Sequence, residues 1–248
     1  MKKTFFFARR NWLEMLRDPI SLFFGVAFPI ILLLLLSLIN GSIPAEAQMT
    51  LFEIGNLAPG IAVFSLSFLT LFSAMLISRD RTSAFVLRLY CSPLSGSGFI
   101  VGYVLPLLPM AAAQMLVCFV TALCMGLAIS WNILLCIAVS LPITVLYIAI
   151  GLICGTLLSE KAVGGACGAL LTNVSAWLSG TWFSLDLIGG AFRKVAYCLP
   201  FANAVDAARA ALAGRTDEIW GNLWIVLVWA AGLTGLAVLI FAKRRKAE

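Results

Sequence analysis

The side chains that could perform chemistry are few and widely separated in this chain of 248 residues. It contains no histidine, which removes His-based metal sites and Ser-His hydrolysis. Its seven cysteines occur singly, without a CxxC pair, and we interpret them as apolar packing residues. The motif Gly-x-x-x-x-Gly-Lys-Ser/Thr is absent, which argues against nucleotide hydrolysis by this chain. We therefore expect no catalytic residue, metal site or cofactor site in this chain.

One internal segment, residues 79–94, combines several basic residues, an amphipathic pattern and a proline. Apolar and basic side chains recur there at helical spacing on different sides, and the proline stops the helix. We predict a short helix parallel to the inner membrane surface, whose apolar ridge contacts a cytosolic partner. The arginines bind either lipid phosphates or acidic residues of that partner. The residues that we expect to couple the movement of this partner to the membrane helices are Arg81, Phe85, Arg88, Leu89 and Pro93.

The rest of the chain is suited to lipid, because 62% of its residues are hydrophobic, 11% are charged and its mean hydropathy is +1.05. Apolar runs of about 20 residues can each cross a hydrocarbon layer as a helix. As drawn from the sequence, none of these spans contains Asp, Glu, Lys or Arg, which argues against proton coupling. The six predicted spans are residues 20–39, 57–78, 98–129, 133–158, 162–183 and 219–242.

Residues 1–19 are predicted to form an amphipathic helix on the cytosolic membrane surface, with Pro19 marking the turn into the bilayer. Arg10 belongs to its charged face, whereas Trp12 and Leu16 belong to its apolar positions. The alternative is a solvated basic tail.

The distribution of basic residues predicts the orientation, because loops rich in Lys and Arg stay in the cytoplasm. Six spans with both termini inside place 13 of the 17 basic residues on the cytosolic side. Residues 40–56 and 184–218 then lie outside, the latter as a short re-entrant or interfacial helical segment. We expect a multi-pass protein of the plasma or inner membrane.

Two glycine pairs, Gly151 with Gly155 and Gly164 with Gly168, have the spacing that lets helix backbones approach closely in lipid. Packing within one subunit and packing across a dimer interface are both open.

The stretch from residue 178 to residue 214 resembles the membrane subunits of ABC-2-type exporters. Those subunits have a Ser-Gly-x-x-Phe-Pro-like turn after the fifth helix, an aromatic-x-Leu-Pro element, and a short helix that ends near Asp-x-x-Arg and a glycine. Ser184 stands where that family usually has proline, and Gly189 and Gly190 fall near a second expected proline. The matching residues are Ser179, Gly180, Phe183, Tyr197, Leu199, Pro200, Asp206, Arg209 and Gly214.

This resemblance implies an all-α integral membrane protein in which residues 1–248 form a single six-helix transmembrane domain. It implies a permease subunit that forms half of an exporter's pathway for a hydrophobic or amphipathic substrate, and not an enzyme or a nucleic-acid-binding protein. The implied partners are two ATP-binding-cassette ATPase subunits, which bind ATP and Mg, and a second permease, identical or homologous. A passive channel, a membrane assembly factor and a membrane-embedded lipid- or peptide-modifying enzyme are the alternatives.

Overall fold

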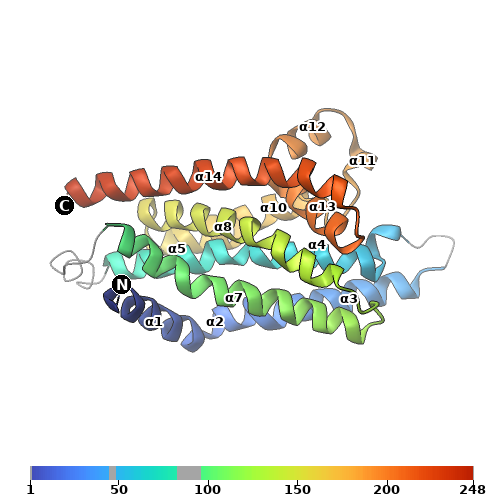
Figure 1. Cartoon of the computed structure of the whole chain (residues 1–248), viewed down its shortest axis with the longest axis horizontal. Coiled ribbons are helices and arrows are strands. Elements are labelled where there is room, and N and C mark those ends of the chain that lie inside the picture. The colour runs from blue at the N-terminus through green and yellow to red at the C-terminus, as the bar shows by residue number, and fades with distance from the viewer. Residues whose placement is uncertain (1, 45–48, 83–95, 248) are drawn as a thin grey trace.

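A computed structural model describes residues 2–44, 49–82 and 96–247. The described residues form helices, turns and loops, without a strand, and the long helices run side by side (Figure 1). This confirms the all-α membrane fold. Both termini lie at the same end of the bundle (Figure 1). Most of the predicted coupling segment lies outside the described residues, including Phe85, Arg88, Leu89 and Pro93.

Among the described residues, five helical stretches are long and apolar enough to cross a membrane. The first joins three helical segments and contains a π-helical turn, and the second is interrupted only at Ser67. The five are Pro19–Ser42 (α2 Pro19–Leu22, η1 Phe23–Ala27 and α3 Phe28–Ser42), Ile54–Thr82 (α4 Ile54–Leu66 and α5 Phe68–Thr82), Ile100–Cys124 within α7 (Gly96–Cys124), Asn132–Leu157 (α8) and Thr216–Lys243 within α14 (Thr216–Ala247).

The remaining predicted span, residues 162–183, is also largely helical. It consists of α9 (Glu160–Val163), the π-helical η4 (Gly164–Leu171) and α10 (Thr172–Leu178). It is not among the five stretches, because the helix ends at Leu178, before the predicted span does, and begins with the charged Glu160 and Lys161. A sixth membrane crossing therefore stays a prediction.

Helices α4 and α5 form the centre of the bundle. Buried residues make up 94% of the most apolar part of Ile54–Thr82, against 17% for Pro19–Ser42 and for Thr216–Lys243. Helix α5 packs on α7, α8 and η4, and α4 packs on α7 and α13 (Pro200–Leu212). The buried Thr70 hydroxyl donates a hydrogen bond to the Tyr147 carbonyl at 3.0 Å. The helix that leads into segment 79–94 is thus enclosed by protein over most of its length.

Glycines on α8 allow α5 to approach closely. A Cβ atom at Gly155 would lie 2.6 Å from the Ala74 carbonyl oxygen and 2.8 Å from the Ala74 Cα, which leaves no room for a side chain. Gly151 meets Thr70 and Ser73 in the same way, whereas Gly164 faces open space. The Gly151 and Gly155 pair therefore serves packing within one subunit.

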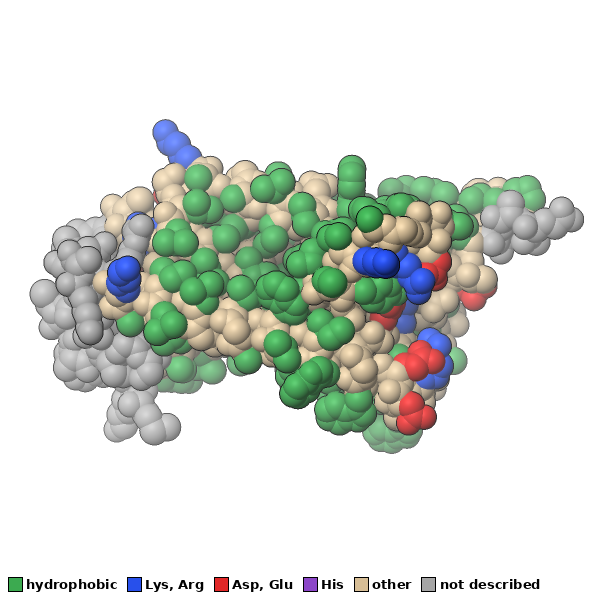
Figure 2. Space-filling view, turned by 90° about the horizontal axis from the view of Figure 1, so that it is seen from above, with side chains coloured by type: hydrophobic (Ala, Val, Ile, Leu, Met, Phe, Trp, Pro, Cys, Tyr) green, Lys and Arg blue, Asp and Glu red, His purple; other side chains and the backbone are tan. Residues whose placement is uncertain are grey.

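The segment before α14 contains α11 (Leu185–Ile188), α12 (Gly190–Cys198) and α13. Helix α12 is largely exposed, but α13 packs against α14, α8 and α4 and is buried on most sides. In Figure 2 apolar side chains cover the middle of the molecule, and charged ones gather at the end that carries α11 and α12. Helix α13 is therefore inserted into the bundle, as expected for a re-entrant element.

Candidate functional site

The last turn of helix α5 contains three consecutive charged residues, Arg79, Asp80 and Arg81. The helix continues past the predicted span end at residue 78 and reaches Thr82. This extension brings Asp80, which is 1% exposed, into the apolar stretch. The predicted span ended at Ser78, so the sequence interpretation assigned Asp80 to the segment beyond it, whereas the helix continues and encloses Asp80 in protein. A buried charge in such a position requires partners.

The partners of Asp80 come from two other helices. Arg10 of α1 (Lys2–Arg17) places Nη1 2.7 Å from Oδ1 and donates a hydrogen bond of 2.8 Å to Oδ2. The Tyr103 hydroxyl on α7 donates to the same Oδ2 at 2.9 Å. Asp80 therefore joins the central helix to the N-terminal helix and to the start of α7 through charge-assisted bonds.

The flanking arginines bind the end of α8 and the start of α9. Arg79 Nε donates to Glu160 Oε1 of α9 at 3.2 Å. Arg81 Nη1 donates to the carbonyl oxygens of Gly155 and Leu158 at 3.0 and 3.3 Å. These carbonyls end α8, where a cation also interacts favourably with the helix dipole.

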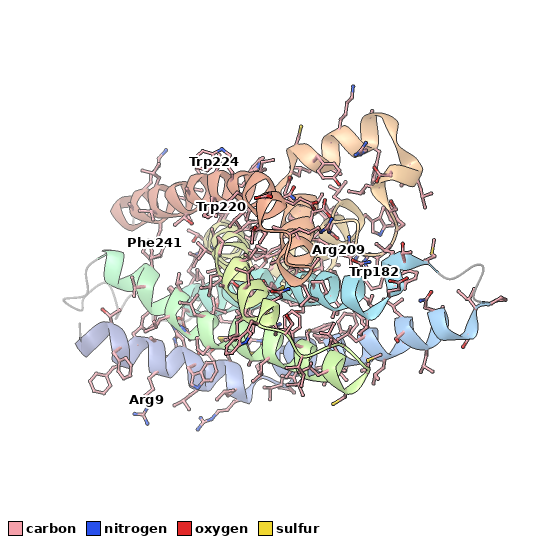
Figure 3. All side chains as sticks on the ribbon, turned by 45° about the vertical axis from the view of Figure 1, so that its right-hand side comes forward. Arg9, Trp182, Arg209, Trp220, Trp224 and Phe241 are labelled. Carbon is pink, nitrogen blue, oxygen red and sulfur yellow. The ribbon has the colours of Figure 1, made fainter. Side chains whose placement is uncertain are left out.

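Helix α1 is held against α7 by one of its faces. Arg10 also pairs with Glu14 at 2.9 Å, and the buried Asn11 amide donates to the Gly102 carbonyl at 3.1 Å. Trp12 is half-buried against the core, whereas Leu16 is 40% exposed. Figure 3 shows Arg9 directed away from the bundle.

The buried face of α1 agrees only in part with the periodicity, which placed Phe5, Ala8, Trp12 and Met15 or Leu16 at apolar helical positions. Phe7, Ala8, Asn11 and Met15 are buried, and the Phe7 ring makes an edge contact with Tyr103 at 5.0 Å between centroids. The exposed apolar side chains of α1 are Phe5, Phe6, Leu13 and Leu16.

The family-like residues of the outer segment also come together. Arg209 Nε donates to the Asn56 carbonyl at the start of α4, and Nη2 donates to the Gly180 carbonyl, both at 3.2 Å. The Tyr197 hydroxyl donates to Asp206 Oδ2 at 2.9 Å. The expected Asp206–Arg209 pair is longer, at 3.8 Å. Figure 3 shows Arg209 and Trp182 near this end of the molecule.

The electrostatics of this outer cluster follow from its burial. Burial raises the pKa of Asp206, although the Tyr197 hydroxyl and the Arg209 cation oppose that shift. Burial lowers the pKa of Arg209, and the Asp206 carboxylate opposes it. Burial, followed by the nearby Asp206, raises the pKa of Tyr197 to about 12. Asp206 and Arg209 thus each compensate part of the other's desolvation, whereas Asp206 adds to the effect of burial on Tyr197.

The other predicted residues build the turn around this cluster. Gly180 has a φ of 68°, in the left-handed region that favours glycine. Phe183 lies against Phe192, with ring centroids 6.3 Å apart, and Pro200 is buried in the first turn of α13. Together they place the Gly180 carbonyl where Arg209 can bind it.

Sequence reasoning missed the partners that complete the cluster at the base of α5. Glu160 was assigned only to a short inner turn, and Tyr103 was one aromatic residue within a predicted span. Arg10 and Asp80 are 70 positions apart, and Arg79 and Glu160 are 81 positions apart. No local pattern connects residues at such separations.

The bundle of apolar helices, with charged groups confined to its two ends, defines a multi-pass membrane protein. A protein-family model described as ABC-2 type transporter matches residues 2–213, so the chain belongs to that family. It is accordingly a membrane-domain permease component of an ABC-type transporter, and it is not itself catalytic. This family generally works with an ATP-binding cassette subunit. A search of curated proteins finds no matching relative.

Proposed function

We propose that this chain is the permease subunit of an ATP-driven exporter and forms half of its transport pathway. A separate ATP-binding-cassette ATPase, which binds ATP and Mg, drives it through segment 79–94. The observation that carries this proposal is the cluster at the base of α5, where Arg79, Asp80 and Arg81 contact α9, α1, α7 and the end of α8.

The mechanism is mechanical. Closure of the ATPase subunits displaces segment 79–94, and the force enters α5 directly because residues 79–82 of the segment belong to that helix. Helix α5 lies at the bundle centre, and its end is bonded to four neighbouring elements. A displacement of this end therefore tilts several elements together rather than one, which suits a two-state gate.

The test replaces the apolar ridge of the coupling segment with the double change Phe85→Asp and Leu89→Asp. We expect the variant to insert normally but to lose both ATPase co-purification and transport. The matched control is Leu187→Asp with Ile188→Asp, which adds two carboxylates to side chains that are 73% and 53% exposed at the opposite end. Full ATP-driven transport by the ridge variant would place coupling elsewhere, with α1 around Trp12 as the next candidate.

The assembly proposed is two permease subunits, identical or homologous, with two ATPase subunits, because this chain shows no internal repeat that could supply the second half of a gate. The apolar spans support a hydrophobic or amphipathic substrate. Mass measurement of the purified complex tests the stoichiometry, and a transport-competent particle with one permease copy would contradict it.

A further inference from the structure

A groove of about 490 Å³ opens beside the base of α5, where α1 ends and α2 begins. Most of the side chains that line it are charged, and both signs are present. The lining residues are Arg10, Leu13, Glu14, Arg17, Asp18 and Arg79.

Four charged side chains of this groove still have hydrogen-bond donors or acceptors that are available to a ligand. Arg17 is exposed and makes no hydrogen bond or ion pair with any described residue, and Arg79 uses its Nε for Glu160. Glu14 pairs with Arg10 through Oε2, and Asp18 accepts from Ser21 through Oδ2. A carboxylate has about four acceptor sites and an arginine five donors, so donors and acceptors both remain.

Leu13, which lines the groove, is 40% exposed, and further exposed apolar side chains adjoin the groove residues along the chain, where the first apolar stretch begins. Leu16, Ile20 and Phe23 are 40%, 49% and 46% exposed. A narrow crevice of about 10 Å³ shares Glu14, Asp18 and Arg79 with the groove and continues toward Phe72 and Met75. The crevice is too small for an acyl chain, so a lipid would place its head group in the groove and its chains along the exposed residues.

We propose that this groove binds the head group of an aminophospholipid such as phosphatidylethanolamine from the adjacent leaflet. Arg17 and Arg79 donate to its phosphate, and Glu14 and Asp18 accept from its primary ammonium. A purely anionic head group would leave the two carboxylates opposite negative charge, and a choline head group has no N–H to donate. The exposed apolar rim favours a lipid over a protein surface. The inference does not depend on the ATPase or on the direction of transport.

The test measures one-lipid adducts of the full-length protein by native mass spectrometry, with equimolar phosphatidylethanolamine, phosphatidylglycerol and phosphatidylcholine in detergent. We expect the phosphatidylethanolamine adduct to dominate. Arg17→Gln should reduce it about tenfold, as expected for one lost bond to a charged group. Arg9→Gln, which makes the same charge change on the same helix outside the groove lining, should leave it unchanged. Glu14→Gln should reduce the preference over phosphatidylglycerol.

Three results would overturn the proposal. Equal adducts in Arg17→Gln and Arg9→Gln would show that the lipid binds elsewhere. Equal binding of phosphatidylglycerol and phosphatidylethanolamine by the unaltered protein would show a simple anion site. Loss of ATPase co-purification in Arg17→Gln, with its lipid adduct intact, would assign the groove to the protein partner. Thermal unfolding of each variant without added lipid separates a loss of binding from a loss of folding.

Discussion

The ion pair between Arg10 and Asp80 should contribute substantially to the stability of the bundle at the base of α5. Arg10→Ala removes the cation that lies 2.7 Å from a carboxylate that is 1% exposed. Breaking a buried pair by removing one partner costs about 3 to 5 kcal/mol. The Arg10 side chain is itself 38% exposed, so we expect the lower end of that range, about 3 kcal/mol. For a chain of this size, that corresponds to a fall in Tm of about 6 to 12 °C.

The assay is thermal unfolding of the purified protein in detergent, followed by tryptophan fluorescence, for a double-mutant cycle. Asp80→Asn removes the buried charge, so the double variant with Arg10→Ala and Asp80→Asn should be more stable than Arg10→Ala alone. Arg9→Ala, an exposed neighbour on α1, is the control and should change Tm little. If the double variant is as unstable as the sum of the two single variants, the pair is not coupled and the reasoning fails.

Three further predictions concern packing, the outer cluster and topology. Gly155→Val should reduce the yield of monodisperse protein and destabilise it by at least about 2 kcal/mol, because the new side chain would collide with Ala74. Gly164 faces open space, so Gly164→Val should be tolerated, and equal yields of the two variants would refute the close approach of α5 and α8. Arg209→Ala should lower the stability of the protein by about 2 kcal/mol or more beyond the effect of Asp206→Ala, because the Arg209 side chain bonds the Asn56 and Gly180 carbonyls and Asp206 does not. The reverse order of the two variants in thermal unfolding would contradict this prediction. In a background without the native cysteines, single cysteines at positions 48 and 189 should react with an impermeant thiol reagent added outside the cell, whereas cysteines at positions 83 and 247 should not. Outside labelling at position 83 or 247 would overturn the proposed orientation.

The hydrophobic pattern alone predicted most of the helices, because a bilayer admits an apolar segment only if its backbone hydrogen bonds are satisfied internally. The family resemblance brought the outer residues into one segment. The pattern ended the second span at Ser78 and predicted a surface helix after it, yet Asp80 is buried because Arg10 and Tyr103 reach it from other helices.

The sequence by itself determined that this is a helical membrane protein, roughly where its spans lie, and that its charged residues gather near the span ends. Only the tertiary structure decided which apolar face packs on protein. Lipid tails are as apolar as leucine, so a membrane helix has similar periodicity whether a face contacts lipid or another helix. For that reason periodicity placed the exposed Phe5 on the apolar face of α1, whereas the fold buries Phe7 and Asn11 against its neighbours. The bonds of Arg79, Asp80 and Arg81 were likewise decided by the fold, because their partners meet them only once α1, α7, α8 and α9 have packed around the end of α5.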